Sequence, residues 1–176
     1  MTDNGIRKGT IADVAELAAL YDTLNDHLAA TINYPGWRKG IYPVRENAQR
    51  AAEEGTLFVY IVNDKIAGSV ILSHEPEEAY HSATWLIDAE YADIIVIHTL
   101  VVHPAYLNRG IGNELMRFAL SHAKEQKQKA VRLDVYENNF PAIALYEKCG
   151  FRYVAKVDLG YASYGLPHFF LYEYVL

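Results

Sequence analysis

The residues with the clearest chemical potential lie where an apolar run gives way to an amphipathic one. The segment runs from Val101 to Asn113 and reads VVHPAYLNRGIGN, with Gly110 and Gly112 near its end. Glycines let a backbone approach a phosphate closely, and the N–H groups and dipole of a following helix stabilise its negative charge. The segment therefore predicts a phosphate-binding loop. A tight strand-to-helix turn without a ligand is the alternative.

Two common phosphate-binding motifs do not fit this segment. A P-loop needs a lysine that is absent here, and Leu115 stands where the dinucleotide-binding fingerprint needs its third glycine. The segment is therefore neither a nucleoside triphosphate loop nor a dinucleotide site.

A second segment, from Asn139 to Phe151, reads NFPAIALYEKCGF. Together the two segments resemble the acyl-CoA-binding motifs of the GNAT superfamily of N-acetyltransferases. That family has a Gln/Arg-x-x-Gly-x-Gly/Ala loop and a later helix that often reads Asn-x-x-Ala-x-x-Leu-Tyr-Glu-Lys-x-Gly-Phe. Leu107 departs from the family's Gln or Arg. Its backbone N–H can still bind phosphate, and Arg109 adds a positive charge.

The resemblance implies a GNAT-like acyl-CoA N-acyltransferase fold, an α/β protein with a mixed, mostly antiparallel central sheet flanked by helices. Residues 1–176 would form a single acetyltransferase domain that binds acetyl-CoA. It would transfer the acetyl group to a primary amine of a small molecule or peptide by direct attack. The residues expected to bind the cofactor are Leu100, Val101, Val102, Leu107, Asn108, Arg109, Gly110, Ile111, Gly112, Asn113, Asn139 and Tyr146.

The resemblance also implies the catalytic groups. A tyrosine on the later helix, here Tyr146, would protonate the leaving thiolate, and a backbone N–H between Leu100 and Val102 would stabilise the oxyanion. The alternative for Tyr146 is a core aromatic residue, because it shares helical spacing with Ala142 and Cys149.

A base must deprotonate the amine, since a free alkyl amine has a pKa of about 10.4. Many family members use a glutamate at the position of Val96 here, which cannot accept a proton. His98 lies two residues further and would face the same side of a strand. Arylalkylamine N-acetyltransferases also use histidine on this strand. His98 is therefore the candidate base, with a hydrogen-bonded core histidine as the equal alternative.

Aromatic residues occupy the two loops from which the family builds its acceptor pocket. Such residues favour an apolar amine or, through cation–π attraction, a cationic one. They are equally suited to packing. The candidate acceptor residues are Tyr34, Trp37, Tyr42, Tyr164 and His168.

The elements that must position these residues follow from the hydrophobic pattern. Apolar residues recur at helical spacing over 14–28, and further helices are expected at 44–54, 110–126 and 141–150. Strands are expected at 57–62, 66–72, 94–102, 131–136, 151–157 and 169–176, with a hairpin turn at 63–64. The polar and aromatic stretch 75–93 reads as an insertion without a predicted shape. This order favours a mixed sheet over a doubly wound parallel one.

Composition narrows the classes of partner. The formal net charge is −6, which argues against binding to nucleic acids or anionic membranes through long-range attraction. Cys149 is the only cysteine, and the histidine spacing indicates no metal site. The longest apolar stretch has nine residues, whereas a membrane-spanning helix needs about 20. We therefore expect a soluble cytoplasmic protein. Its apolar closing strands make a homodimer plausible.

Three functions fit to different degrees. An N-acetyltransferase fits best. A catalytically weak CoA- or acyl-CoA-binding regulatory module is the alternative, because Val96 and Leu107 depart from the family pattern. A purely structural or interaction domain is disfavoured by the two motifs, which occur in the expected order. Turnover with acetyl-CoA and a panel of amines separates the first two, and CoA binding tests the third.

Overall fold

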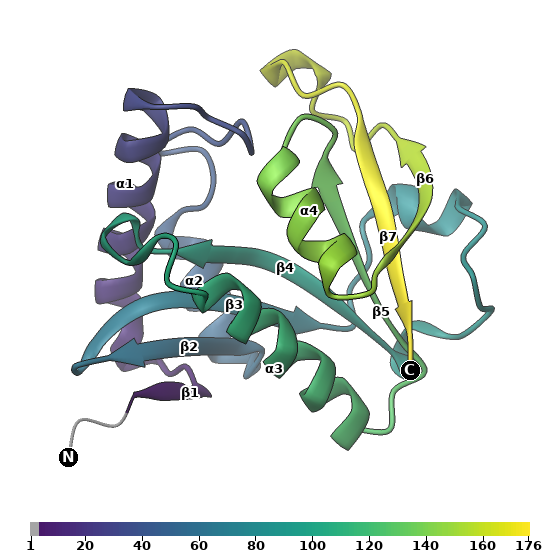
Figure 1. The fold of residues 1–176 in the computed structure, drawn as a ribbon, viewed down its shortest axis with the longest axis horizontal. Helices are drawn as coiled ribbons and strands as arrows, with labels where there is room; N and C mark the ends of the chain where they lie inside the picture. The colour runs from purple at the N-terminus through teal and green to yellow at the C-terminus, as the bar shows by residue number, and fades with distance from the viewer. Residues whose placement is uncertain (1–3) are drawn as a thin grey trace. The chain divides into compact units, whose positions relative to one another are not determined.

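The computed structural model describes residues 4–176, which form one seven-stranded sheet and four α-helices (Figure 1). Hydrogen bonding orders the strands β1-β2-β3-β4-β5-β7-β6. The strands are β1 (Gly5–Lys8), β2 (Leu57–Val62), β3 (Lys65–Ser73), β4 (Ile94–Val102), β5 (Ala130–Tyr136), β6 (Arg152–Val157) and β7 (Phe169–Val175). The helices are α1 (Val14–Ala30), α2 (Arg45–Glu54), α3 (Ile111–Glu125) and α4 (Phe140–Lys148). Strands β4 and β5 are parallel, whereas β1–β2, β2–β3, β5–β7 and β6–β7 are antiparallel. This confirms the mixed, mostly antiparallel α/β fold.

Every helix and strand predicted from the hydrophobic pattern is present in the structure, and the predicted and observed boundaries differ by only a few residues. Strand β1 was not predicted. It is four residues long and is defined by its antiparallel pairing with β2, for example Ile6 with Tyr60. The 75–93 stretch contains two short 3₁₀ helices, η2 (Glu78–Ser82) and η3 (Tyr91–Asp93).

Contacts between residues divide the described part of the chain into two compact units. Unit 1 comprises residues 4–33, 37–72 and 98–115, and unit 2 comprises 34–36, 73–97 and 116–176. Strand β4 and helix α3 each pass from one unit into the other.

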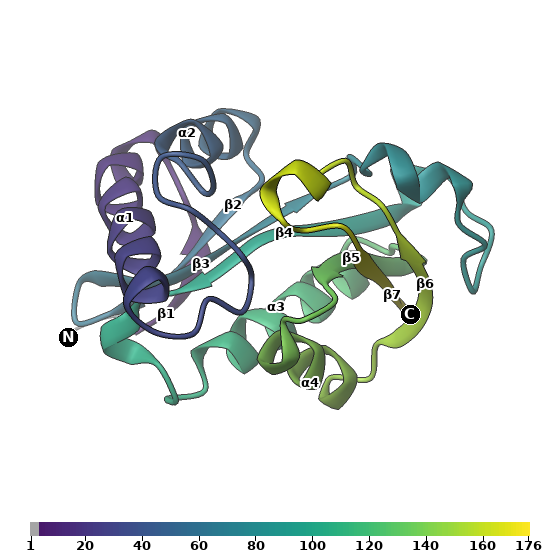
Figure 2. The same ribbon diagram turned by 90° about the horizontal axis from the view of Figure 1, so that it is seen from above.

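Helices α1 and α2 cover one face of the strands in unit 1 (Figure 2). Their apolar side chains pack on β2, β3 and the end of β4, and the most deeply buried include Leu17, Tyr21, Leu57 and Val59. Tyr21 Oη, Asn25 Oδ1 and Ser69 Oγ are also buried in this unit. Burial raises the pKa of Tyr21 to about 12.

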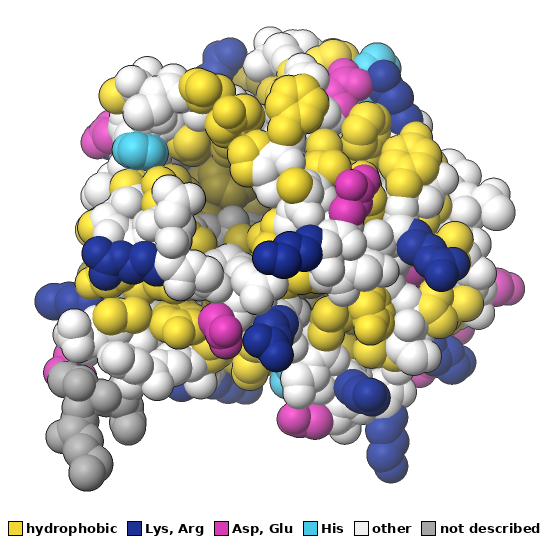
Figure 3. All heavy atoms as spheres, in the orientation of Figure 1, with side chains coloured by type: hydrophobic (Ala, Val, Ile, Leu, Met, Phe, Trp, Pro, Cys, Tyr) yellow, Lys and Arg dark blue, Asp and Glu magenta, His cyan; other side chains and the backbone are white. Residues whose placement is uncertain are grey.

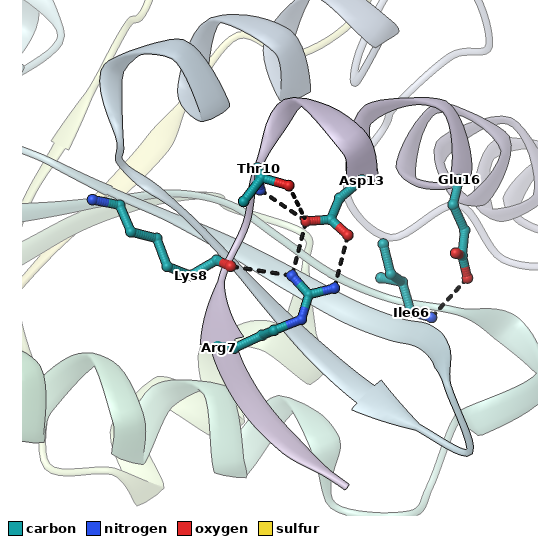
Figure 4. Close-up of polar contacts among 6 residues, drawn as sticks. All are labelled: Arg7, Lys8, Thr10, Asp13, Glu16 and Ile66. Atoms are coloured by element: carbon teal, nitrogen blue, oxygen red, sulfur yellow. Dashed lines mark hydrogen bonds and ion pairs between the residues drawn. The ribbon is translucent and has the colours of Figure 1, made fainter. Parts of the chain in front are cut away.

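An ion pair fastens β1 to the start of α1 (Figure 4). Both terminal nitrogens of Arg7 donate to Asp13, each at 2.8 Å. The same carboxylate accepts from the Thr10 backbone N–H at 2.8 Å, so it also caps the first helical turn. Glu16 accepts a hydrogen bond from the Ile66 N–H at 2.8 Å, which ties α1 to β3.

Gly68 lets β3, β4 and α3 approach closely within unit 1. An ideal Cβ at this position would lie 2.8 Å from the Val101 carbonyl oxygen and 3.2 Å from Ile111 Cγ2. The His103 N–H donates to the Ala67 carbonyl at 2.8 Å. The end of β4, which leads into the glycine loop, is therefore held against β3.

The 74–93 segment is the 75–93 stretch together with His74. In unit 2, helix α4 and this 74–93 segment cover opposite faces of β7. Tyr172 Oη donates to Glu147 of α4 at 2.9 Å, and Glu173 accepts from the Leu86 N–H of the segment at 2.6 Å. Successive strand residues point to opposite faces, so these two contacts identify the two covered sides.

A buried ion pair anchors the 74–93 segment to the sheet. Arg132 Nε donates to Glu173 Oε1 at 3.0 Å, and the two side chains are 2% and 0% exposed. The guanidinium also donates to the Ile87 carbonyl and lies 4.3 Å from the centre of the Trp85 ring. Tyr91 stacks nearby, with its ring centre 5.2 Å from the guanidinium carbon. The ring faces and the backbone of the segment thus satisfy a charge that would be costly to bury alone.

Some apolar side chains remain exposed on unit 2. Figure 3 shows hydrophobic side chains gathered over the region of α4 and β6, at the upper right, with acidic and basic groups among them. The exposed large apolar side chains of unit 2 include Phe140 on α4, Tyr153 on β6, and Tyr161 and Tyr164 between β6 and β7. Among the described helices, none is both long enough and apolar enough to span a membrane.

Candidate functional site

The glycine loop of unit 1 leads from β4 to α3 through a short 3₁₀ helix, η4 (Pro104–Tyr106). His103 Nδ1 accepts from the Ala105 N–H at 3.0 Å, so this histidine caps η4. Asn108 and Gly110 then adopt left-handed backbone conformations, with φ of 61° and 81°, and α3 begins at Ile111. Left-handed residues in a turn can direct neighbouring N–H groups into one concave surface that suits an anion.

This loop is compatible with the phosphates of a CoA molecule. An ideal Cβ at Gly110 would meet no heavy atom within 4 Å, so the space beside the backbone is open there. The first N–H groups of α3 have no acceptor within the helix, and the helix dipole favours a negative charge at this end. Arg109 supplies a cation whose guanidinium carbon lies 5.2 Å from the centre of the Tyr106 ring. Leu107 is 41% exposed and supplies no charge.

Strand β4 is distorted directly after His98. Thr99 has a φ of 49°, which is rare and strained for a β-branched residue. Tyr42 Oη and Thr99 Oγ1 share a short hydrogen bond, and Asn25 Nδ2 donates to the Tyr42 carbonyl at 3.1 Å. The loop after α1 is therefore fastened to β4 beside His98, which is half-buried. The regular alternation that relates His98 to Val96 stops at this distortion.

Tyr146 lies on α4 in unit 2 and is 8% exposed. Burial raises the pKa of its phenol well above the ordinary value, and the nearby charge of Asp134 raises it further. The phenol therefore keeps its proton at every pH near neutral, as a general acid must before it acts.

Asp134 is a residue that the sequence reasoning missed. It lies on β5 between the buried Leu133 and Val135, and it accepts a hydrogen bond from Tyr80 Oη at 2.6 Å. Its charge raises the pKa values of three surrounding phenols, those of Tyr80, Tyr146 and Tyr161. The available signal was a carboxylate in the middle of a mostly buried strand.

Two of the loops predicted to form the acceptor pocket meet within unit 2. An ideal Cβ at Gly36, beside Tyr34, would lie 2.3 Å from Leu166 Cδ2, so the 34–36 stretch packs directly on the β6–β7 loop. That loop also carries Tyr164 and His168. His168 Nδ1 lies 3.4 Å from Glu137 Oε1, and Glu137 is also paired with Lys156.

Trp37 and Tyr42 lie in unit 1, and both have packing contacts. Their rings meet edge to face, with centroids 5.4 Å apart, and Trp37 packs against the core beneath α1 and α2. Asn139 is placed as a helix cap, because its side chain accepts from the Ala142 N–H at 3.4 Å at the start of α4.

No group of three or more His, Cys, Asp or Glu side chains that could hold a metal ion occurs within residues 4–176.

Solved structures share this fold over nearly the whole chain. A GNAT-family acetyltransferase from Streptococcus agalactiae superposes with a TM-score of 0.78 at 18% identity, covering 100% of this chain and 99% of that one. A Salmonella typhimurium protein solved with its cofactor acetyl-CoA has a TM-score of 0.67 at 17% identity, covering 97% and 92% of the two chains.

Sequence comparison gives the family. An uncharacterized N-acetyltransferase from Methanocaldococcus jannaschii is 29% identical over 155 residues, which is 84% of this chain but 62% of that relative's length. Residues 18–151 match the sequence model of the acetyltransferase (GNAT) family. This match covers most of the chain and includes the glycine loop, His98 and Tyr146, so the chain belongs to the GNAT family of acetyltransferases.

Proposed function

We propose that this protein is an N-acetyltransferase that moves the acetyl group of acetyl-CoA to a primary amine of a small molecule or a peptide. The observation that carries the proposal is the loop before α3. Its residues 108 and 110 are left-handed, it has open space beside Gly110, and it leads into a fifteen-residue helix.

The backbone N–H groups of 108–112 are assigned to the pyrophosphate of acetyl-CoA, and those near the end of β4 to the acetyl carbonyl. The Leu107 N–H, which the sequence also suggested for the pyrophosphate, donates to the Pro104 carbonyl at 3.4 Å. Arg109 adds a positive charge beside the loop. A bound thioester would supply an activated acetyl group and a thiolate leaving group. The protein itself would hold the phosphates, orient the carbonyl group and move two protons.

The acetyl transfer requires the following balance. The amine nitrogen forms a bond to the acetyl carbon while the carbon–sulfur bond breaks. The amine gives up a proton to a base, and the departing thiolate takes a proton from Tyr146 Oη. The phenol of Tyr146 is protonated at neutral pH, as a proton donor must be.

Two side chains are candidates for the base. His98 lies on β4 next to the distortion at Thr99, and a neutral imidazole can accept a proton near pH 7. Asp134 is a carboxylate whose charge already acts on Tyr146. We assign the role to His98 and treat Asp134 as the competitor that the experiments must separate.

The acceptor is proposed to bind near the junction of the 34–36 stretch and the β6–β7 loop. Tyr34, Tyr164 and His168 provide aromatic surface there, and Glu137 provides a carboxylate next to His168. Aromatic rings and a carboxylate suit an amine that arrives as a cation.

Acetyl-CoA binding is tested by thermal unfolding. At a concentration of 100 times the dissociation constant, the ligand should raise the Tm by about 5–10 °C. Gly110→Val should lower this shift strongly, because its side chain fills the space that a phosphate would use. Gly160→Val is the matched control, since Gly160 also has a positive φ of 88° and no heavy atom within 4 Å of an ideal Cβ. A protein whose Tm does not respond to acetyl-CoA would contradict the proposal.

Turnover with a panel of amines then separates the enzyme from a regulatory module. Release of free CoA that depends on the added amine is the expected result. Binding of acetyl-CoA without any amine-dependent release would favour the CoA-binding regulatory module.

A further inference from the structure

The loop after α1 contacts β4 through a tyrosine hydroxyl, directly before the backbone that is proposed to bind the acetyl carbonyl. Resting on the proposed function, we propose that Tyr42 is a positioning residue. Its hydroxyl holds Thr99 in a left-handed conformation, and this conformation directs the N–H groups that follow on β4 towards the acetyl carbonyl. Tyr42 thus acts on the reaction through the backbone of β4, without touching acetyl-CoA or the amine.

The contact joins two side chains that are far apart in the sequence. Tyr42 Oη and Thr99 Oγ1 share a hydrogen bond across a separation of 57 residues. Thr99 is 8% exposed, so water competes little for this hydrogen bond. Both residues belong to unit 1, and the contact is therefore a property of that unit alone.

The backbone of Thr99 needs such a contact. Its φ is 49°, a value that is a genuine outlier for a β-branched residue. Conformations of this kind persist only where the surrounding structure determines them. Without the hydrogen bond from Tyr42, residue 99 should relax towards the extended backbone of an ordinary strand.

A change at residue 99 is passed on to the peptide groups that follow it. Because each peptide is planar, the Thr99 dihedral angles set the direction of the Leu100 N–H. The chain is held again at residue 103, where the His103 N–H donates to the Ala67 carbonyl at 2.8 Å. Residues 100–102, which are assigned to the acetyl carbonyl, therefore lie between two fixed points.

Tyr42 is itself held in place by its neighbours. Asn25 lies on α1 and is 2% exposed, and its Nδ2 donates to the Tyr42 carbonyl at 3.1 Å. The Tyr42 N–H donates to the Arg38 carbonyl at 3.0 Å. The Tyr42 ring meets the ring of Trp37, which packs against the core beneath α1 and α2. A phenol mounted in this way can orient its partner, because it has little freedom of its own.

The first test removes the hydroxyl and keeps the ring. Loss of one oxyanion donor costs about 10²- to 10³-fold in kcat, and a donor that is only misdirected should cost less. Tyr42→Phe is therefore expected to lower kcat about tenfold and to leave the KM for the amine unchanged. An unchanged kcat with a raised KM for the amine would show that Tyr42 contacts the acceptor, as the sequence suggested, and would overturn the positioning role.

Tyr60→Phe is the matched control. Tyr60 is also a half-buried tyrosine of unit 1, but it lies on β2, which β3 separates from β4. This variant should keep the kcat of the parent protein. A tenfold loss in the control as well would overturn the assignment, because the effect would then not depend on the contact with Thr99.

A double-mutant cycle shows whether Tyr42 acts through Thr99. Thr99→Val keeps the branched shape without the hydroxyl and should lower kcat as Tyr42→Phe does, whereas Thr99→Ser keeps the hydroxyl and should retain most of the activity. In the Thr99→Val protein, the added Tyr42→Phe change should have no further effect on kcat. Independent, multiplying effects would overturn the proposal. A thermal unfolding curve for each variant shows whether the fold is retained.

An infrared measurement tests the inference without turnover. A hydrogen bond to a carbonyl oxygen lowers the C=O stretching frequency. The band of bound acetyl-CoA is isolated by the difference between thioester labelled with ¹³C at the carbonyl and unlabelled thioester. In the parent protein and in Tyr60→Phe, this band should lie below that of free acetyl-CoA. In Tyr42→Phe the shift should be smaller, because the N–H groups of residues 100–102 are misdirected.

The outcomes are distinct. A carbonyl shift in Tyr42→Phe equal to that of the parent overturns the positioning role, and a loss of kcat in that variant would then act elsewhere, for example at the neighbouring His98. A shift that is present in the parent and reduced in Tyr42→Phe, in a protein that acetylates no amine, overturns the proposed function while supporting the role of Tyr42 in directing β4 towards the carbonyl.

Discussion

Burial and a nearby charge act together on the phenol of Tyr146, the proposed acid. Removal from water disfavours the phenolate, and the charge of Asp134 disfavours it again, so both effects raise the pKa. A raised pKa keeps the phenol protonated but makes it a weaker acid. The proposed proton transfer therefore requires a thiolate whose own pKa is raised by exclusion from water.

The first prediction removes this proton donor. Tyr146→Phe keeps the ring that packs near Phe151 but should lower kcat by about 10²- to 10⁴-fold. Acetyl-CoA binding, measured by calorimetry, should change little. Tyr153→Phe is the matched control, because Tyr153 is 51% exposed on β6 and should tolerate the loss of its hydroxyl. Full activity in the Tyr146→Phe protein would show that Tyr146 is a core packing residue and not the acid.

The second prediction identifies the base. With His98 in that role, kcat/KM should rise with pH through an inflection that His98→Gln abolishes and Asp134→Asn leaves in place. With Asp134 in that role, the two substitutions should have the opposite effects on the inflection. A profile that moves with the pKa of the acceptor amine, and survives both substitutions, would show that neither group is the base.

At the residue scale, the motifs predicted the positions of the glycine loop, between β4 and α3, and of Tyr146, on α4. Their roles in binding and catalysis stay predictions. Asp134 was not singled out because its hydrogen bond with Tyr80 arises only from the fold. The distortion at Thr99 could not be predicted from the sequence, because residues 94–102 have the pattern of an uninterrupted strand.

At the scale of elements, the spacing of apolar residues predicted the helices and strands, because each element buries one of its faces in the core. The hairpin turn at Asn63 and Asp64 followed the same logic, and both residues adopt the left-handed conformation that such turns require. Strand β1 was missed because four residues carry too little pattern. The 75–93 stretch had no predicted shape, because the buried Arg132 side chain that organises it lies on β5 and leaves no local pattern in that stretch.

The third prediction concerns the attachment of β1 to α1. The hydrogen bonds from Arg7 lower the pKa of Asp13, so the carboxylate contributes stability above its ordinary pKa of 3.8. This contribution is lost as the pH falls through the lowered value. Because Arg7 is half exposed, solvent screening limits the contribution to about 1 kcal/mol.

Urea unfolding at several pH values measures this contribution. Asp13→Asn should be less stable than the parent at pH 7, and the difference should shrink towards pH 3 and below. Asp26→Asn is the matched control, since the side chains of the Lys39–Asp26 pair are both more than half exposed, so its loss should change the stability much less. Equal losses in both variants would show that burial of Asp13 adds nothing.

At the scale of the whole molecule, each unit has its own apolar core. In unit 1 that core lies beneath α1 and α2, and in unit 2 it lies beneath the 74–93 segment. The residues proposed to bind the cofactor phosphates belong to unit 1, whereas the proposed acid belongs to unit 2. A substitution that weakens one core can thus impair one half of the reaction, either holding acetyl-CoA or protonating the thiolate, before it affects the other.

The placement of the two tryptophans has an optical consequence. Trp37 packs on the core of unit 1, and Trp85 lies in unit 2 between Tyr80 and the Arg132 guanidinium. Each unit therefore carries its own fluorophore. The emission of a Trp37→Phe protein reports on unit 2 alone, and that of a Trp85→Phe protein reports on unit 1 alone. Without any added dye, the unfolding of each unit can therefore be followed separately.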